Sequence, residues 1–155
     1  MKALAFDDTV LIQDWLDGVE LSVTVIGDAD DPQALPPVEI HAREGLYDTE
    51  ARLDPDRVEY FCPVRPESLA ADESEAASVR SEIERVALEA YHAFACRDLA
   101  RIDMIWDGAQ SRIIDIKTFP GMTEFSLVPM AVETSGIGME TLVDELVRNA
   151  YERGN

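Results

Sequence analysis

The chain has 155 residues, of which 46% are hydrophobic and 29% charged, a composition ordinary for one globular domain with a hydrophobic core. Its 32 acidic and 13 basic residues give a formal net charge of -19, which repels nucleic acid and anionic membranes. Because the sequence contains no signal peptide pattern, no run long enough to span a membrane and no CxxC pair, we expect a cytoplasmic protein.

The first part of the chain is expected to be rich in strands. Residues 10–16 and 20–26 both have strand-like sequence, and the Asp17-Gly18 pair between them predicts a hairpin. A further strand is predicted at residues 38–42. Residues 43–66 then have the pattern of a loop that crosses a site and leads into a short strand.

The second part of the chain is expected to combine helices with one more hairpin. Apolar residues recur at helical spacing over 74–94, and Asp72 can cap this helix, which we expect to pack against the hairpin that follows it. A short helix at 131–135 and an amphipathic helix at 139–151 close the chain. These elements predict an α+β fold, with a mostly antiparallel sheet flanked by helices.

Two carboxylates lie inside strand-like sequence, where an acid is costly unless a cation, a donor or solvent compensates it. They are Asp103 and Asp115, and the DGAQ turn at 107–110 can place them side by side on neighbouring antiparallel strands. A pair of carboxylates suggests Mg²⁺, which binds few protein oxygens and completes its shell with phosphate and water. The loop at 120–123 follows, and its glycine lets backbone N–H groups approach a substrate closely.

Motifs in this region carry a resemblance to a known family. They are Arg-Ile-Asp at 101–103, Asp-Ile-Lys-Thr-Phe-Pro-Gly-Met-Thr at 115–123 and Ser-Leu-Val-Pro at 126–129, with earlier matches LIQDWLDGVELSV at 11–23, LPPVEI at 35–40, YDTEAR at 47–52 and FCP at 61–63. In order and spacing the chain resembles the C-terminal part of the D-alanine–D-alanine ligases of the ATP-grasp superfamily. The resemblance implies a single C-terminal ATP-grasp lobe over residues 1–155, without the N-terminal substrate domain and the phosphate-loop portion of a whole ligase.

The resemblance also implies an activity and roles for particular residues. In such ligases ATP phosphorylates the carboxylate of one D-alanine, and the amine of a second D-alanine attacks the acyl phosphate, a reaction in peptidoglycan precursor synthesis. Arg101 and Gly121 match the groups that face the oxyanion. Ser126 and Leu127 match the residues that hold the carboxylate of the second substrate. Asp103 and Asp115 match the acidic metal ligands.

The nucleotide side of the site is implied to lie in the first predicted hairpin. Gln13, Trp15 and Leu16 match the segment that lines the adenine pocket, although a Trp and a Leu in a strand are more often core residues. Glu20 matches the acid that binds the ribose hydroxyls. Arg52 stands where the family usually has a lysine near phosphate, and it presents a planar fork in place of a compact ammonium.

Two departures from the family pattern affect the expected metal site. Lys117 replaces the asparagine that would give the metal a neutral oxygen, and an ammonium group has no acceptor. It could instead pair with Asp103 and Asp115. Asp115 itself replaces a glutamate, which withdraws the carboxylate by one methylene. A simpler alternative for Arg101 is a buried ion pair with Asp115.

Two functions therefore remain open from the sequence. The chain is either the C-terminal catalytic part of an ATP-dependent ligase or a non-catalytic ligase-like module that binds a ligand or partner. Expected partners are D-alanine and either a second copy of the chain, through residues 10–26, or a complementary N-terminal ligase fragment.

Overall fold

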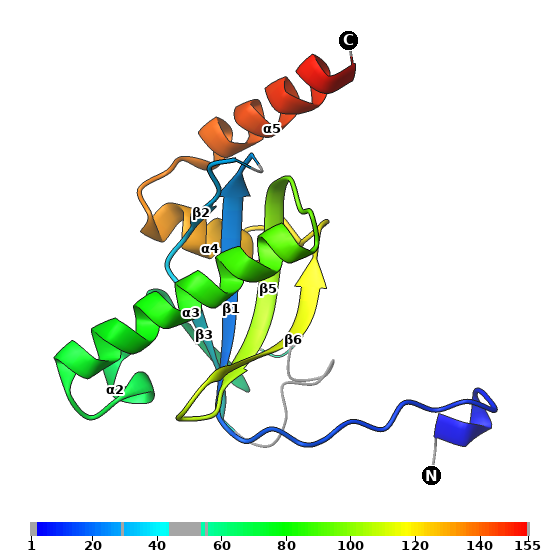
Figure 1. Cartoon of the computed structure of the whole chain (residues 1–155), viewed down its shortest axis with the longest axis vertical. Coiled ribbons are helices and arrows are strands. Elements are labelled where there is room, and N and C mark those ends of the chain that lie inside the picture. The colour runs from blue at the N-terminus through cyan, green and yellow to red at the C-terminus, as the bar shows by residue number, and fades with distance from the viewer. Residues whose placement is uncertain (1–2, 29, 44–53, 55, 155) are drawn as a thin grey trace.

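The computed structural model describes residues 3–28, 30–43, 54 and 56–154. Within them, six strands form one antiparallel sheet whose main path runs β4-β3-β1-β5-β6, with β2 paired to β1 beside β3. The strands are β1 Val19–Gly27, β2 Gln33–Ala34, β3 Val38–Ala42, β4 Val58–Phe61, β5 Asp98–Trp106 and β6 Ser111–Lys117. The helices are η1 Ala3–Ala5, α2 Pro66–Leu69, α3 Glu73–Ala93, α4 Leu127–Thr134 and α5 Met139–Gly154 (Figure 1). The predicted α+β fold is confirmed.

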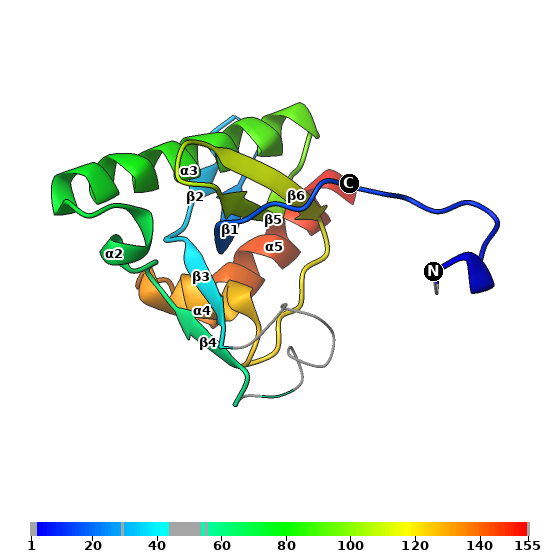
Figure 2. The ribbon, with the colours of Figure 1, turned by 90° about the horizontal axis from the view of Figure 1, so that it is seen from below.

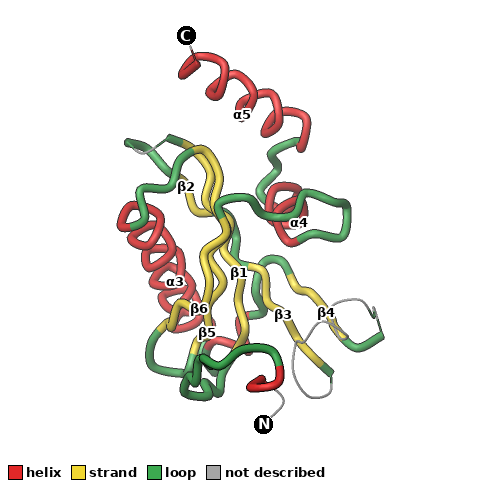
Figure 3. Tube along the Cα trace, turned by 90° about the vertical axis from the view of Figure 1, so that its right-hand side faces the viewer, coloured by secondary structure: helices red, strands yellow, loops and turns green. Residues whose placement is uncertain are grey.

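The two central strands are paired along their whole length, from Val19 opposite Trp106 to Gly27 opposite Asp98. Helices cover both faces of the sheet, and Figure 3 shows α3 and α4 on opposite sides of it. Successive side chains of a strand point to opposite faces. The apolar residues Leu21, Val23 and Val25 of β1 are buried in the core beneath α3, whereas Glu20, Ser22 and Thr24 lie on the face that α4 covers.

Helix α3 forms where the helical spacing predicted it. Asp72 is its N-cap, and its carboxylate accepts hydrogen bonds from the backbone N–H groups of Ser74 and Glu75. Ile83 and Tyr91 are fully buried and belong to the same apolar cluster as residues of β1 and β5. The helix therefore packs against the strand that carries Asp103, as predicted.

A second apolar cluster holds α4 and α5 against the other face of the sheet. Helix α4 begins at Leu127, four residues before the predicted start at 131. The prediction placed the helix after Pro129, but proline is tolerated in the first turn of a helix, and Pro129 lies there. Helix α5 is tied to the start of β5: Asp98 accepts hydrogen bonds from Asn149 and pairs with Arg153. The apolar contacts of α4 with the sheet place its N-terminus on the same face as the polar side chains of β1 and β5.

The prediction of a strand at residues 10–16 is wrong. One side of β1 pairs with β5 and the other with β3 and β2, so the sheet has no position beside β1 for a strand from this segment. The segment instead leaves the end of β1 as a largely exposed chain without strand pairing and extends away from the sheet toward the N-terminus (Figure 2). Gly18 marks the point where it joins the sheet, because a Cβ there would lie 2.2 Å from the carbonyl oxygen of Trp106.

The remaining sequence predictions concern the loop at 43–66 and the membrane. The predicted short strand is β4, whereas most of the loop, residues 44–53 and 55, lies outside the described residues. Among the helices that the structure describes, none has the length and apolar character needed to cross a membrane.

Candidate functional site

Four charged side chains meet where β5 pairs with β6. The turn at 107–110 closes this hairpin, with the backbone N–H of Asp107 donating to the carbonyl of Gln110. Asp103 lies directly opposite Asp115, and Arg101 lies opposite Lys117, so all four share one face of the sheet. The prediction that the two acids lie side by side on neighbouring strands is confirmed.

Asp103 is buried and fully hydrogen-bonded. Its Oδ1 accepts from Ser22 Oγ and from Arg101 Nε, both at 2.8 Å, and its Oδ2 accepts from Arg101 Nη2 at 2.7 Å and Lys117 Nζ at 3.0 Å. Burial alone would raise the pKa of Asp103, but the hydrogen bonds and charges of Arg101 and Lys117, with Ser22, outweigh it and lower this pKa. Asp103 is therefore a charged acceptor at neutral pH.

Arg101 takes Asp103 as its partner, not Asp115. Arg101 and Asp103 are 6% and 7% exposed, so they form the buried bidentate pair of this cluster. The alternative of a buried Arg101–Asp115 pair is thus wrong about the partner. Asp115 is exposed and pairs with Lys117 instead.

Lys117 bridges the two acids, as the sequence suggested it could. Its ammonium nitrogen contacts Oδ2 of Asp103 and Oδ2 of Asp115. Partial burial would lower the pKa of Lys117, but hydrogen bonds to Asp115 and Asp103 outweigh this and raise it. The group therefore carries its positive charge between the carboxylates.

Mg²⁺ does not fit this arrangement. The four hydrogen bonds to Asp103 use about all the lone-pair sites of a carboxylate, and the ammonium group of Lys117 stands between the two acids. Within the described part of the chain, no group of three or more His, Cys, Asp and Glu side chains is placed to hold a metal ion. Asp103 and Asp115, expected as metal ligands, form a self-neutralised cluster with Arg101 and Lys117.

The N-terminus of α4 brings together Gly121, which was predicted to face the oxyanion, and Ser126 and Leu127, which were predicted to hold a substrate carboxylate. Ser126 is the N-cap residue, and its Oγ accepts from the backbone N–H of Thr123 at 3.1 Å. Gly121 lies against it, since a Cβ on Gly121 would be 3.0 Å from Ser126 Oγ. Leu127, the first helical residue, is buried in the second apolar cluster. Free N–H groups in the first turn of a helix attract anions such as carboxylates.

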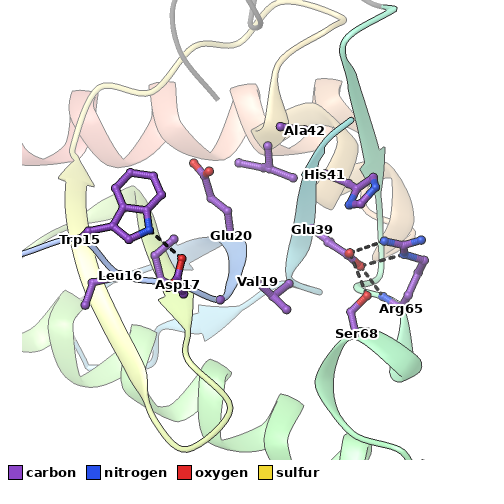
Figure 4. Close-up of a pocket in the computed structure, with 13 residues that line it drawn as sticks. Trp15, Leu16, Asp17, Val19, Glu20, Glu39, His41, Ala42, Arg65 and Ser68 are labelled. Carbon is purple, nitrogen blue, oxygen red and sulfur yellow. Dashed lines mark hydrogen bonds and ion pairs between the residues drawn. The ribbon is translucent and has the colours of Figure 1, made fainter. Parts of the chain in front are cut away.

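A cavity of about 370 Å³ opens at the end of β1 and is lined by three of the predicted nucleotide residues, Trp15, Leu16 and Glu20 (Figure 4). Its volume is in the range of small-molecule sites. Trp15 is largely exposed, and its Nε1 donates to Asp17. Gln13 is exposed and is not among the lining residues, and Arg52 lies outside the described residues.

Glu20, which lines this cavity, has a strongly raised pKa. Burial, and then the charge of Asp103, raise its pKa from 4.5 to about 7. The carboxyl group is therefore about half protonated at neutral pH, so that it can donate as well as accept a hydrogen bond.

Sequence reasoning missed the other side of the cavity. Glu39 is buried there, and its carboxylate accepts hydrogen bonds from Arg65 and Ser68; Figure 4 shows these three residues across from Trp15. A signal was present, because Glu39 is an acid within strand-like sequence, as Asp103 is. Its partners come from the α2 region, which the sequence did not place.

Comparisons with known proteins show the family to which the chain belongs. A family model described as "D-ala D-ala ligase C-terminus" matches residues 1–148. A D-alanine–D-alanine ligase of Alcanivorax borkumensis is 35% identical over 155 residues, which are 99% of this chain and 46% of the relative. One of Actinobacillus succinogenes is 37% identical over 146 residues, 94% of this chain and 43% of the relative.

Solved structures share the fold. The D-alanine–D-alanine ligase of Coxiella burnetii superimposes with a TM-score of 0.70 and 25% identity over 98% of this chain and 37% of its own. The Bacillus anthracis enzyme, crystallised with ATP, gives a TM-score of 0.64 and 23% identity over 85% of this chain and 39% of its own. The chain thus spans less than half the length of these relatives, and it belongs to the family of the D-Ala–D-Ala ligase C-terminus.

Proposed function

We propose that this chain is the C-terminal catalytic part of an ATP-dependent ligase that joins two D-alanine molecules through an acyl phosphate, in cytoplasmic synthesis of peptidoglycan precursors. One observation carries the proposal. In a chain matched to the family over residues 1–148, Arg101, Asp103 and the N-terminus of α4 lie on the same face of the sheet. The proposal treats residues 1–155 as one C-terminal ATP-grasp lobe that works with a ligase portion not contained in this sequence.

Each proposed group has a physical role that its surroundings support. The guanidinium of Arg101, held in place by Asp103, and the backbone N–H of Gly121 would stabilise the oxyanion that forms when the amine attacks. The N-terminus of α4, at Ser126 and Leu127, would hold the carboxylate of the acceptor. ATP would place its base and ribose in the cavity lined by Trp15, Leu16 and Glu20 and would supply the phosphoryl group. The family resemblance also assigns Gln13 and Arg52 to the nucleotide.

A second candidate is a ligase-like module that binds a nucleoside or partner without catalysis. Lys117 favours it, because its ammonium group occupies the position between Asp103 and Asp115 that the family resemblance assigns to a metal. The nucleoside cavity would still be present in such a module.

A chimeric enzyme tests the two candidates. The part of the Alcanivorax borkumensis ligase that precedes its matching region is fused to this chain, and ATP-dependent formation of D-alanyl-D-alanine is measured. We expect dipeptide formation. Ser126→Ala should then raise the KM for the acceptor about tenfold, because one charged hydrogen bond is lost. Ser135→Ala, at the other end of the same helix, is the matched control and should leave KM unchanged.

A separate measurement tests the second candidate, the binding module without catalysis. Adenosine binding to the unmodified chain is followed by fluorescence of the exposed Trp15, with Trp15→Phe as the control that leaves only buried Trp106. If adenosine changes the Trp15 signal but the folded chimera makes no dipeptide, the chain is a binding module.

The exposed segment at 7–17 supports the proposal of a homodimer. Leu11, Ile12 and Trp15 are 82%, 83% and 67% exposed, and four aspartates accompany them. At the edge of the sheet, β6 presents two half-exposed isoleucines, Ile113 and Ile114, that the apolar side chains of this segment can cover. We propose that the segment of one copy adds as a strand to β6 of another, since an unpaired edge is a template for pairing.

Self-association should strengthen as salt is added. Two chains of charge -19 repel each other over long range, and salt screens this repulsion with a Debye length of ~8 Å at physiological ionic strength while leaving apolar burial intact. Sedimentation at low and high salt measures the effect, and Ile12→Asp should abolish it. Val143→Asp, on the exposed side of α5, is the control. A chain that stays monomeric at both salt concentrations refutes the homodimer, and association only with an N-terminal ligase fragment supports the complementary-fragment alternative.

A further inference from the structure

Arg101, Asp103, Asp115 and Lys117 form a cluster that resembles a cation site. The position of the cation is taken by the ammonium group of Lys117. Asp115 and Lys117 are two residues apart on β6 and point to the same face, toward Asp103 on β5. The ammonium nitrogen of Lys117 contacts one oxygen from each carboxylate. A cation shared by these two acids would occupy this position.

The hydrogen-bond arrangement leaves no coordination position on the buried acid. Asp103 accepts four hydrogen bonds from Ser22, Arg101 and Lys117, and a carboxylate has about four lone-pair sites. A metal ion could reach Asp103 only by displacing one of these donors. The exposed Asp115 alone would offer a single carboxylate, a weak site for a hard cation.

The charge of the cluster points in the same direction. Asp103 and Asp115 each carry one negative charge, and Arg101 and Lys117 each carry one positive charge. The charges of the four side chains therefore sum to zero. A divalent cation would therefore enter a neutral site with two positive groups beside it. With Lys117 removed, the same site would carry one net negative charge and an open space between the acids.

We propose that Lys117 is an internal cation that takes the position between Asp103 and Asp115 and excludes divalent metal ions from this site. The proposal concerns only these side chains and goes beyond the proposed ligase function, because it holds whether or not the chain takes part in catalysis. It predicts that ligands reach this part of the lobe without a metal ion bound by Asp103 and Asp115.

Manganese binding to the whole chain tests the proposal, with the electron paramagnetic resonance signal of free Mn²⁺ as the readout. Because a chain of charge -19 binds cations over its surface, the comparison is between variants. Lys117→Asn should gain a site about tenfold tighter than any in the parent, since it removes a charge and adds an oxygen ligand. Adding Asp115→Asn to Lys117→Asn should abolish that site.

Arg112→Asn is the matched control. Arg112 lies on the same strand, is exposed and pairs with Asp107, so its removal changes the net charge equally but leaves the cluster intact. A gain in Lys117→Asn no larger than in Arg112→Asn overturns the proposal. In the parent chain, Asp115→Asn should weaken Mn²⁺ binding no more than Glu145→Gln, which removes one exposed carboxylate elsewhere, and this arm stands even if Lys117→Asn fails to fold. Weakening by Asp115→Asn beyond that of Glu145→Gln means that a metal binds beside Lys117, which also overturns the proposal.

Discussion

Replacement of Glu20 by Gln should stabilise the protein at pH 8 and leave its stability nearly unchanged at pH 4. Folding raises the pKa of Glu20 from 4.5 to about 7, through burial and then the charge of Asp103. One pKa unit corresponds to about 1.4 kcal/mol. Because Glu20 lines a cavity that is open to solvent, screening by water reduces the cost of the ionised carboxyl in the folded state to about 1 to 2 kcal/mol. Gln keeps the shape of the protonated acid and avoids that cost.

The sign of the effect follows from proton binding. Between pH 4.5 and about 7 the folded protein holds the Glu20 proton while the unfolded chain has lost it, so the free energy of unfolding falls as pH rises through this window. Above the folded pKa both states are ionised and the contribution of Glu20 is constant. The difference in unfolding free energy between Glu20→Gln and the parent should therefore grow from pH 4.5 to 7 and then level off.

Urea denaturation at a series of pH values measures this difference, with unchanged m-values as evidence that only stability has changed. Glu145→Gln, at an exposed position of α5, is the matched control and should show no growth across the window. A flat difference for Glu20→Gln would mean that solvent reaches the carboxyl group freely in the folded protein.

Asp103→Asn should be the most destabilising polar substitution in the site, by about 3 to 5 kcal/mol, because it leaves a buried arginine without its counter-charge. Arg101 is 6% exposed, and two of its N–H groups donate to Asp103. An asparagine offers one acceptor oxygen and no negative charge in their place. Urea denaturation at pH 7 gives the loss.

Two comparisons make the cause of this loss specific. Asp115→Asn removes a carboxylate from the same cluster, but its pair with Lys117 is exposed, so the expected cost is below ~1 kcal/mol. The double variant Arg101→Met with Asp103→Leu removes both buried charges and should be clearly more stable than Asp103→Asn. Equal losses for Asp103→Asn and Asp115→Asn would show that the Arg101–Asp103 pair is not the buried one.

Local sequence determined several parts of the fold and site. The position of α3 followed from apolar spacing and from Asp72, because a helix buries one periodic face and its cap satisfies the first N–H groups. The pairing of Asp103 with Asp115 followed from two strand-like runs around a tight turn. Both depend on residues close together in the chain, where backbone geometry limits the alternatives.

Other features were decided only by tertiary structure. Residues 10–16 have the composition of a strand, but both sides of β1 are occupied by strands from later in the chain, so no position beside β1 remains for this segment. The hydrogen bonds of Glu39 also depend on tertiary structure. Its partners Arg65 and Ser68 are more than 20 residues away in the sequence, and the fold brings them next to its carboxylate.

The partners within the charged cluster show the same division. The sequence determined that Arg101, Asp103, Asp115 and Lys117 share one face, because the strand period is two residues. The one pair that the sequence suggested for Arg101, with Asp115, is wrong. Burial decided the partner: Asp103 lies on the central strand β5 beside Ser22 of β1, whereas Asp115 lies on the edge strand in contact with solvent. The buried base pairs with the buried acid because an unpaired charge costs most where water cannot reach it.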